Sequence, residues 1–461
     1  MDATLDATRP AATLPSGSRT PPAAPCPPPS SAPPAASLGA VAGPGRPAVT
    51  ELRLSAFGRH RAAAFPLGPV TLFAGASGSG KSQALAAYAA LSRLASGAAL
   101  DEVFPDPAAH VPERAVPDPD GRRGFRIGCT VDGPAGPVRL DLAVQAEPEL
   151  RVVGERLAQD GQMLLTTALR DPRRRSVQAA WFTGGAVGVT RAPLPDDRLA
   201  TALLPLRVAG ATAGQRRVLA AAEQVVVALR SVFPCDPRPE RMRAPVPQGD
   251  GRLHGDCRNL ADVLRRTRHE CATRHALLAA AARTGCAGPV AGLDVRGAAA
   301  GPGGGTGGGG RGGPGAGRGG PGAGRGGPVG GRGGPVGGPV GGLGGGLVAA
   351  VLDRGPGVPA TDLGRLGAGE LRFLALALVL LTGPGVLQVE PVADVLAARQ
   401  ALTVLADDLD RGLDRGQSAE LLRLALLSSG RGHVRLAAAV GEATAGTGRG
   451  LPGVSVVDLV P

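Results

Sequence analysis

Apolar and polar residues alternate along this chain in patterns that predict strands and helices in turn. The run VTELRLSAF (49–57) has the period of a half-buried strand, and residues 61–67 and 69–73 predict two further strands. Residues 81–94 carry apolar residues at helical spacing, and short alternating runs over 124–190 are typical of antiparallel strands. Further along, the pattern predicts helices over 215–233, 259–283 and 369–381, strands over 346–352, 386–389, 434–440 and 454–460, and two more helices near the end. Strands in alternation with helices predict an α/β fold with added layers.

Two segments lack this periodicity and divide the chain. Residues 1–46 are mostly Ala, Pro and Ser, which predicts a disordered tail, because such a segment buries too little apolar surface to offset its ordering entropy. Residues 300–346 are mostly Gly with a seven-residue Arg repeat, which predicts a flexible linker. An RGG-type nucleic-acid contact is the alternative, although that class interleaves aromatic residues and this segment has none. The remainder divides into an N-terminal lobe over 47–200, a helical insertion over 201–299 and a C-terminal lobe over 347–461.

Composition excludes several classes of protein. No stretch reaches the roughly 18 apolar residues that a membrane span needs, so no membrane partner is expected. Asp2 and Asp6 stand where a signal peptide carries positive charge, which favours a cytoplasmic location. The six cysteines include no CxxC pair, which favours reduced thiols over a disulfide framework. Cys257, His269 and their neighbours Cys271 and His275 do not have the spacing of a zinc site.

The strongest chemical signal is a glycine-rich loop between a predicted strand and a predicted helix. Its residues match G-x-x-x-x-G-K-S/T, a pattern whose backbone N–H groups enclose the phosphates of a nucleotide. Lys81 adds a positive charge to those phosphates and the Ser82 hydroxyl can bind Mg²⁺. Lys81 is the only lysine among 50 basic residues, and a random lysine would complete this pattern only about 0.3% of the time. The predicted nucleotide-binding residues are Gly75, Ala76, Ser77, Gly78, Ser79, Gly80, Lys81, Ser82 and Gln83.

Residues 49–85, which contain this loop, are similar to the opening of SMC- and RecF-like ATPases of the ABC type. LGAGELRFLALALVLL (366–381) resembles the signature helix of that group, GPGVLQVEP (383–391) resembles its Walker B strand, and GDCRNLADVL (255–264) resembles a helical-arm element. The resemblance implies a P-loop NTPase fold, namely an ABC-type ATPase head with an antiparallel β lobe and a helical insertion. It also implies ATP and Mg²⁺ as ligands, and a homodimer through the ATPase heads.

The chain departs from this group at several functional positions. Gly367 stands where the signature has Ser, and Val389 replaces the first of two Walker B acids. Glu390 is therefore the predicted catalytic acid, acting with Lys81, and a predicted Mg²⁺ ligand together with Ser82. Gly441 occupies the place of the switch histidine, and no Q-loop glutamine is identified. Three functions stay open: a slowly hydrolysing ATPase, a nucleotide-gated scaffold without appreciable turnover, and a nucleic-acid-associated ATPase.

Overall fold

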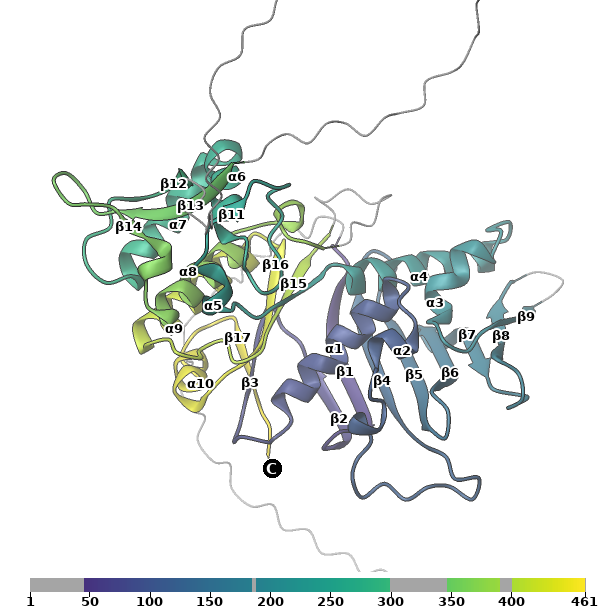
Figure 1. Cartoon of the computed structure of the whole chain (residues 1–461). Helices are drawn as coiled ribbons and strands as arrows, with labels where there is room; N and C mark the ends of the chain where they lie inside the picture. Colours follow the sequence, from purple (N-terminus) through teal and green to yellow (C-terminus); the bar gives the residue numbers. More distant parts are fainter. Residues whose placement is uncertain (1–44, 185–187, 299–345, 390–399, 461) are drawn as a thin grey trace, which may run out of the picture. The chain divides into compact units, whose positions relative to one another are not determined.

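The computed structural model describes residues 45–184, 188–298, 346–389 and 400–460 (Figure 1). Strands from the N-terminal part form an eight-stranded antiparallel sheet in the order β2-β1-β4-β5-β6-β7-β8-β9. Its strands are β1 (Ala48–Phe57), β2 (His60–Pro66), β4 (Arg123–Asp132), β5 (Val138–Glu147), β6 (Arg151–Gln159), β7 (Gln162–Ala168), β8 (Ser176–Phe182) and β9 (Val189–Pro195). This confirms the antiparallel strands that the alternating runs predict.

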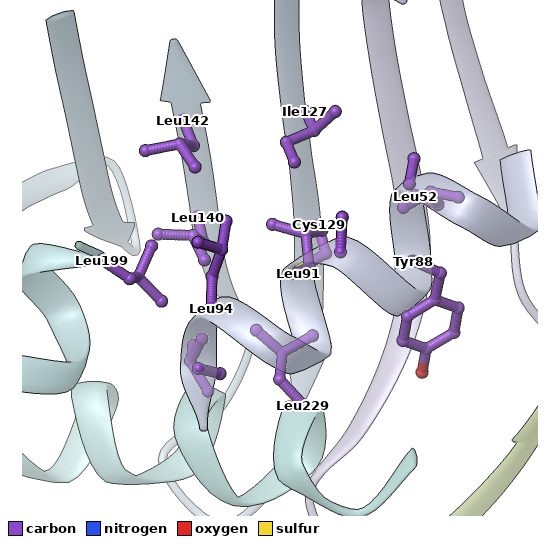
Figure 2. Packing of buried hydrophobic residues seen from close by; sticks show 14 of the residues in the cluster. Leu52, Tyr88, Leu91, Leu94, Ile127, Cys129, Leu140, Leu142, Leu199 and Leu229 are labelled. Atoms are coloured by element: carbon purple, nitrogen blue, oxygen red, sulfur yellow. The ribbon is translucent and has the colours of Figure 1, made fainter. Parts of the chain in front are cut away.

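One face of the antiparallel sheet is apolar and packs against helices. Leu91 and Leu94 of α1 (Lys81–Ala95) lie against Ile127 and Leu140 of the sheet in one buried cluster, which Figure 2 shows at close range. Helix α4 (Ala213–Arg230) contributes buried side chains to the same cluster. The alternation of apolar and polar residues along these strands follows from this one-sided burial, because successive side chains point to opposite faces of a strand.

A second sheet of five parallel strands has the order β10-β15-β16-β3-β17. These strands are β3 (Val70–Ala74), β10 (Val232–Cys235), β15 (Leu402–Ala406), β16 (Val434–Ala439) and β17 (Val454–Asp458). All residues of β3 and of β15 are buried, as expected of central strands in a parallel sheet covered on both faces. The carboxyl ends of the five strands therefore lie along one edge of the sheet, where open α/β sheets bind ligands.

A small third sheet, helices and short turns complete the described chain. The third sheet consists of β11 (Val246–Pro247), β12 (Gly292–Ala298), β13 (Leu347–Asp353) and β14 (Thr361–Asp362). The other helices are α2 (Leu100–Val103), α3 (Ala200–Leu203), α5 (Pro239–Met242), α6 (Leu260–Glu270), α7 (Ala272–Gly285), α8 (Ala368–Leu380), α9 (Arg415–Gly430) and α10 (Glu442–Arg449). Single 3₁₀ turns occur at Ala108–His110, Leu204–Leu206, Leu363–Arg365 and Pro384–Val386. The predicted α/β fold is confirmed.

Three sequence predictions need correction. The strand predicted over 386–389 is wrong, because its start lies in the 3₁₀ turn Pro384–Val386 and Leu387 makes only an isolated bridge to Leu253. Pro384 and Gly385 favour a turn there, and the sheet takes β15 instead, a strand that the pattern did not reveal. The helix predicted over 259–283 breaks at Cys271 into α6 and α7. The segment 201–299, expected to be helical, also supplies β10, β11 and β12.

Candidate nucleotide-binding site

The glycine-rich loop joins the buried strand β3 to the first turn of α1. Gly75, Gly78 and Gly80 adopt positive φ angles of 141°, 78° and 99°, a region that residues with a Cβ atom rarely occupy. A Cβ atom at Gly75 would clash with the carbonyl oxygen of Leu459, and one at Gly80 would lie 2.6 Å from Nε2 of His60. Glycine is therefore required at these two positions both for the backbone conformation and for space.

The loop and the start of α1 present positive charge and free donors to the edge of the sheet. Lys81 Nζ donates to the carbonyl oxygens of Gly75 at 2.8 Å and Ala76 at 3.1 Å, which holds the ammonium group over the loop. No side chain caps the N-terminus of α1, and its first turn contains no acidic residue. The Ser79 hydroxyl is buried and has no hydrogen-bond partner among the described residues. A phosphate fits this surface, because helix N-termini and inward-facing amides bind anions.

The turn between β1 and β2 braces the loop. Arg59 Nη1 donates to the carbonyl oxygen of Gly78, and His60 Nε2 lies 3.0 Å from the carbonyl oxygen of Gly80. The Arg59 backbone N–H donates to Oε1 of Gln83 at 2.9 Å. Gln83 was predicted as a nucleotide-binding residue; in this structure its side chain ties α1 to the β1–β2 turn. Sequence reasoning did not select Arg59, although the turn lies between two predicted strands.

An acidic residue reaches the loop from another strand of the sheet. Asp407 follows β15 directly, and its Oδ1 accepts a hydrogen bond of 3.0 Å from the hydroxyl of Ser82. Strand β16 lies between β15 and β3, so the two groups meet at the shared carboxyl edge. A hydroxyl and a carboxylate are the oxygen ligands that Mg²⁺ prefers, and this pair fits such an ion. Asp408, the next residue, is held at a φ of 48°, an uncommon conformation for a residue other than glycine.

Two features identify the fold. The first is the strand–loop–helix unit of β3 and α1, and the second is strand β15, whose carboxyl end is followed by this acid. The chain has the fold of a P-loop NTPase. The glycine-rich segment Gly75–Ser82 runs from the end of β3 into the first residues of α1 at the edge of the sheet, and its binding of phosphate stays a prediction. Glu390, the predicted catalytic acid, lies outside the described residues. Asp407 and Asp408 were missed, because the short, mostly apolar run LTVLA before them does not by itself show that it is a strand of this sheet.

A cavity of about 440 Å³ adjoins the pair of Ser82 and Asp407. The side of α1 forms its apolar wall, and the loop that follows β10 brings charged side chains to it. The lining residues with charged side chains are Asp236, Arg238, Arg241, Asp256 and Asp407. The site therefore combines a phosphate loop, two adjacent acids and a charged hollow beside them.

The predicted signature helix is α8. Gly367 is its N-cap residue, and the Glu370 carboxylate accepts from the backbone N–H of Gly367 and from that of Ala287, both at 2.8 Å. Gly367 and Ala368 are exposed, so the start of α8 faces solvent. At the expected switch-histidine position, after β16, the Gly441 N–H donates to Asp410 Oδ2 at 3.0 Å.

No helix in the described ranges is long and apolar enough to cross a membrane. Within those same ranges, no group of three or more His, Cys, Asp or Glu side chains could hold a metal ion. A Mg²⁺ ion at Ser82 and Asp407 would therefore depend on the nucleotide phosphates and water for its other ligands, as is usual for this ion.

The sequence matches no established protein family and no curated protein. In structure the chain is similar to an SMC head bound to the C-winged helix domain of ScpA, at 12% identity, 85% coverage of this chain, 90% of that chain and a TM-score of 0.43. It is also similar to the SMC head domain from Thermotoga maritima, at 13% identity, 86% coverage of this chain, 90% of that chain and a TM-score of 0.34. A third similar structure is the Smc head domain with an extended coiled coil bound to the C-terminal domain of ScpA from Pyrococcus furiosus. It has 10% identity, 87% coverage of this chain, 92% of that chain and a TM-score of 0.41. The sheet order and the strand–loop–helix unit of β3 and α1 define the fold independently of these similarities.

Proposed function

We propose that this protein binds ATP with Mg²⁺ and hydrolyses it slowly. The observation that carries the proposal is the hydrogen bond of 3.0 Å between Ser82 of the phosphate loop and Asp407 at the end of β15. It brings the hydroxyl and the carboxylate of a metal site to the loop that fits the phosphates. Ser82 and Asp407 would hold a bound Mg²⁺, which would supply positive charge against the negative charge that develops on the phosphates.

The chain's own groups divide the work between binding and chemistry. The backbone N–H groups of the loop and the Lys81 ammonium would hold the phosphates, and Ser82 and Asp407 would hold the ion. A further carboxylate must orient the attacking water and accept its proton. Asp408, next to Asp407, and Glu390, the residue that the resemblance implies, are the two candidates. Because Gly367 lacks the hydroxyl of the usual signature residue, turnover is expected well below about 1 s⁻¹.

We also propose that two copies of the chain dimerise around ATP. The exposed start of α8 supports this, because Gly367 and Ala368 lie at the surface, where the first turn of the helix can meet another molecule. The Gly367 N–H itself is taken by the Glu370 carboxylate, which a phosphate would have to displace. Each of the two sites would then combine the phosphate loop of one copy with α8 of the other. The same glycine favours the alternative of a nucleotide-gated scaffold, which closes on ATP without appreciable turnover.

Nucleotide titrations test the binding site. Lys81→Ala should weaken the affinity for a fluorescent ATP analogue at least about tenfold, because it removes the one ammonium group that can reach the phosphates. Asp407→Asn should remove the gain in affinity that Mg²⁺ provides and leave the affinity in EDTA unchanged. Asp250→Asn, at an exposed carboxylate outside the site, is the matched control and should leave both affinities unchanged. Wild-type affinity in folded Lys81→Ala would reject the site.

Phosphate release and size-exclusion chromatography separate the two functions. The acid that performs the chemistry is the one whose amide variant, Asp408→Asn or Glu390→Gln, abolishes phosphate release while ATP still binds. An ATP-dependent dimer with no phosphate release in the wild type would establish the scaffold function instead. A wild type that stays monomeric with ATP would refute the dimer.

A further inference from the structure

A buried arginine lies near the start of the otherwise apolar part of α8. Arg372 is only 5% exposed, and the residues that follow it in the helix are all buried. An arginine in such surroundings is costly unless hydrogen bonds satisfy its guanidinium group. The partners of Arg372 therefore indicate what this side chain does.

The guanidinium group of Arg372 joins two loops at the carboxyl edge of the parallel sheet. Nη1 donates to the carbonyl oxygen of Pro237 at 2.6 Å and lies 3.3 Å from Oδ1 of Asp236, both in the loop after β10. Nη2 donates to the carbonyl oxygen of Asp408 at 3.0 Å, in the turn after β15. One side chain thus connects α8 with the two loops that carry acids beside the phosphate loop.

Both loops belong to the surroundings of the proposed metal site. The Asp236 side chain lines the same cavity as Ser82 and Asp407. Asp408 follows Asp407 directly, and the hydrogen bond from Arg372 holds its carbonyl oxygen while its φ is 48°. A planar guanidinium group places donors on separate nitrogen atoms and so reaches acceptors on two loops at once, whereas the donors of a lysine all sit on one atom.

We infer that Arg372 is a positioning residue for the Mg²⁺ site, holding Asp236 and the turn of Asp407 and Asp408 in register with α8. This inference rests on the proposed function. Arg372 does not line the cavity beside Ser82 and Asp407, so it would act through the backbone carbonyl groups of Pro237 and Asp408 that it holds. A shift of α8 against a second copy would therefore change the affinity of the site for Mg²⁺.

A merely structural role for Arg372 predicts a different result. Removing a buried, hydrogen-bonded arginine lowers the stability of any protein, so loss of stability alone does not test the inference. Arg435 provides the matched control. It lies on β16, and its Nη2 donates to the carbonyl oxygens of Val49, Leu67 and Gly68 at 3.2, 2.9 and 3.0 Å, near the amino end of the sheet. It is mostly buried, and burial lowers its pKa.

The test is the Mg²⁺ dependence of ATP binding by the full-length chain. A fluorescent ATP analogue is titrated in EDTA and at increasing Mg²⁺ for the wild type, Arg372→Met, Arg372→Lys and Arg435→Met. Arg372→Met should raise the Mg²⁺ concentration at the midpoint about 10- to 100-fold, the usual effect of losing a group that orients metal ligands. Affinity in EDTA should not change, and Arg372→Lys should show a smaller shift. Arg435→Met should lower the melting temperature and leave the Mg²⁺ midpoint unchanged.

Two outcomes overturn the inference. The first is that an Arg372 variant that folds has the same Mg²⁺ midpoint for ATP binding as the wild type. The second is that Arg435→Met shifts this midpoint as much as Arg372→Met does. Failure of the proposed function gives a separate result: a wild-type protein that does not bind ATP, or whose ATP affinity does not respond to Mg²⁺, has no such site for Arg372 to position.

Discussion

Glu155 on β6 allows a sharp test of the antiparallel lobe. Its side chain is fully buried, and its carboxylate accepts hydrogen bonds from the backbone N–H groups of Ala200 at 2.6 Å and Thr201 at 2.7 Å, as well as from the Thr201 hydroxyl. These bonds favour the charged form, but burial outweighs them and raises the pKa of Glu155 from 4.5 to about 7. The folded protein therefore holds a proton that the unfolded chain releases.

The sign and size of the pH effect follow from this difference. Below pH 4.5 the Glu155 carboxyl is protonated in both states, and its contribution to stability is fully present. As the pH rises from 4.5 to about 7, only the unfolded state loses the proton, so the free energy of unfolding falls. The pKa values differ by about 2.5, which corresponds to about 3 kcal/mol.

The change to make is Glu155→Gln, which has no titrating proton. Urea unfolding of both proteins would be measured at several values between pH 4 and pH 8 from the fluorescence of Trp181, the only tryptophan in the chain. Trp181 is on β8 of the same sheet and is 4% exposed, so it reports on this lobe. The difference in unfolding free energy between wild type and variant should fall by about 3 kcal/mol between pH 4.5 and 7. Taking the difference cancels the other titrating groups, and a constant difference would refute this reasoning.

Two further predictions concern the phosphate loop and the Gly-rich segment. Gly80→Ala should cost about 1–3 kcal/mol of stability through its backbone conformation alone, and should weaken ATP binding because the new Cβ displaces His60. Calorimetry measures the first effect and nucleotide titration the second. Unchanged stability and unchanged ATP affinity would contradict the loop geometry. Replacing 300–346 by a shorter Gly/Ser segment should leave ATP affinity within about twofold, because halving a loop changes its closure free energy by only about 0.6 kcal/mol. Ala298 and Leu347, on either side of that segment, already pair across β12 and β13, and a loss of ATP binding would show that the segment itself is needed.

The strand–loop–helix unit around the candidate phosphate loop could be predicted from sequence because its signal is local. Eight consecutive residues carry it, and the apolar strand before it and the helix after it agree with it. The same holds for α8, whose apolar run predicts a buried helix without knowledge of its neighbours. Both predictions depend on residues that are adjacent in the chain.

Asp407 could not be placed in the same way. Its strand is the five-residue run LTVLA, which is too short for periodicity to distinguish a buried strand from part of a helix. Only the strand order shows that β16 alone separates this run from β3. The carboxyl end of the run therefore lies beside Ser82. Arg372 was equally hidden, because its partners lie in loops far from it in sequence.

The position of β3 in the parallel sheet has a consequence for synthesis on the ribosome. Its two neighbours are β16 and β17, which begin roughly 360 residues after β3 ends. At about 5–20 residues per second, translation reaches them some 20–70 s after β3 has been made. During that interval a mostly apolar strand has no partner on either side, and a nascent chain is exposed to aggregation there. A fragment that stops before residue 434 would therefore contain the whole phosphate-loop sequence without β16 and β17, the two strands that hold β3 in the sheet.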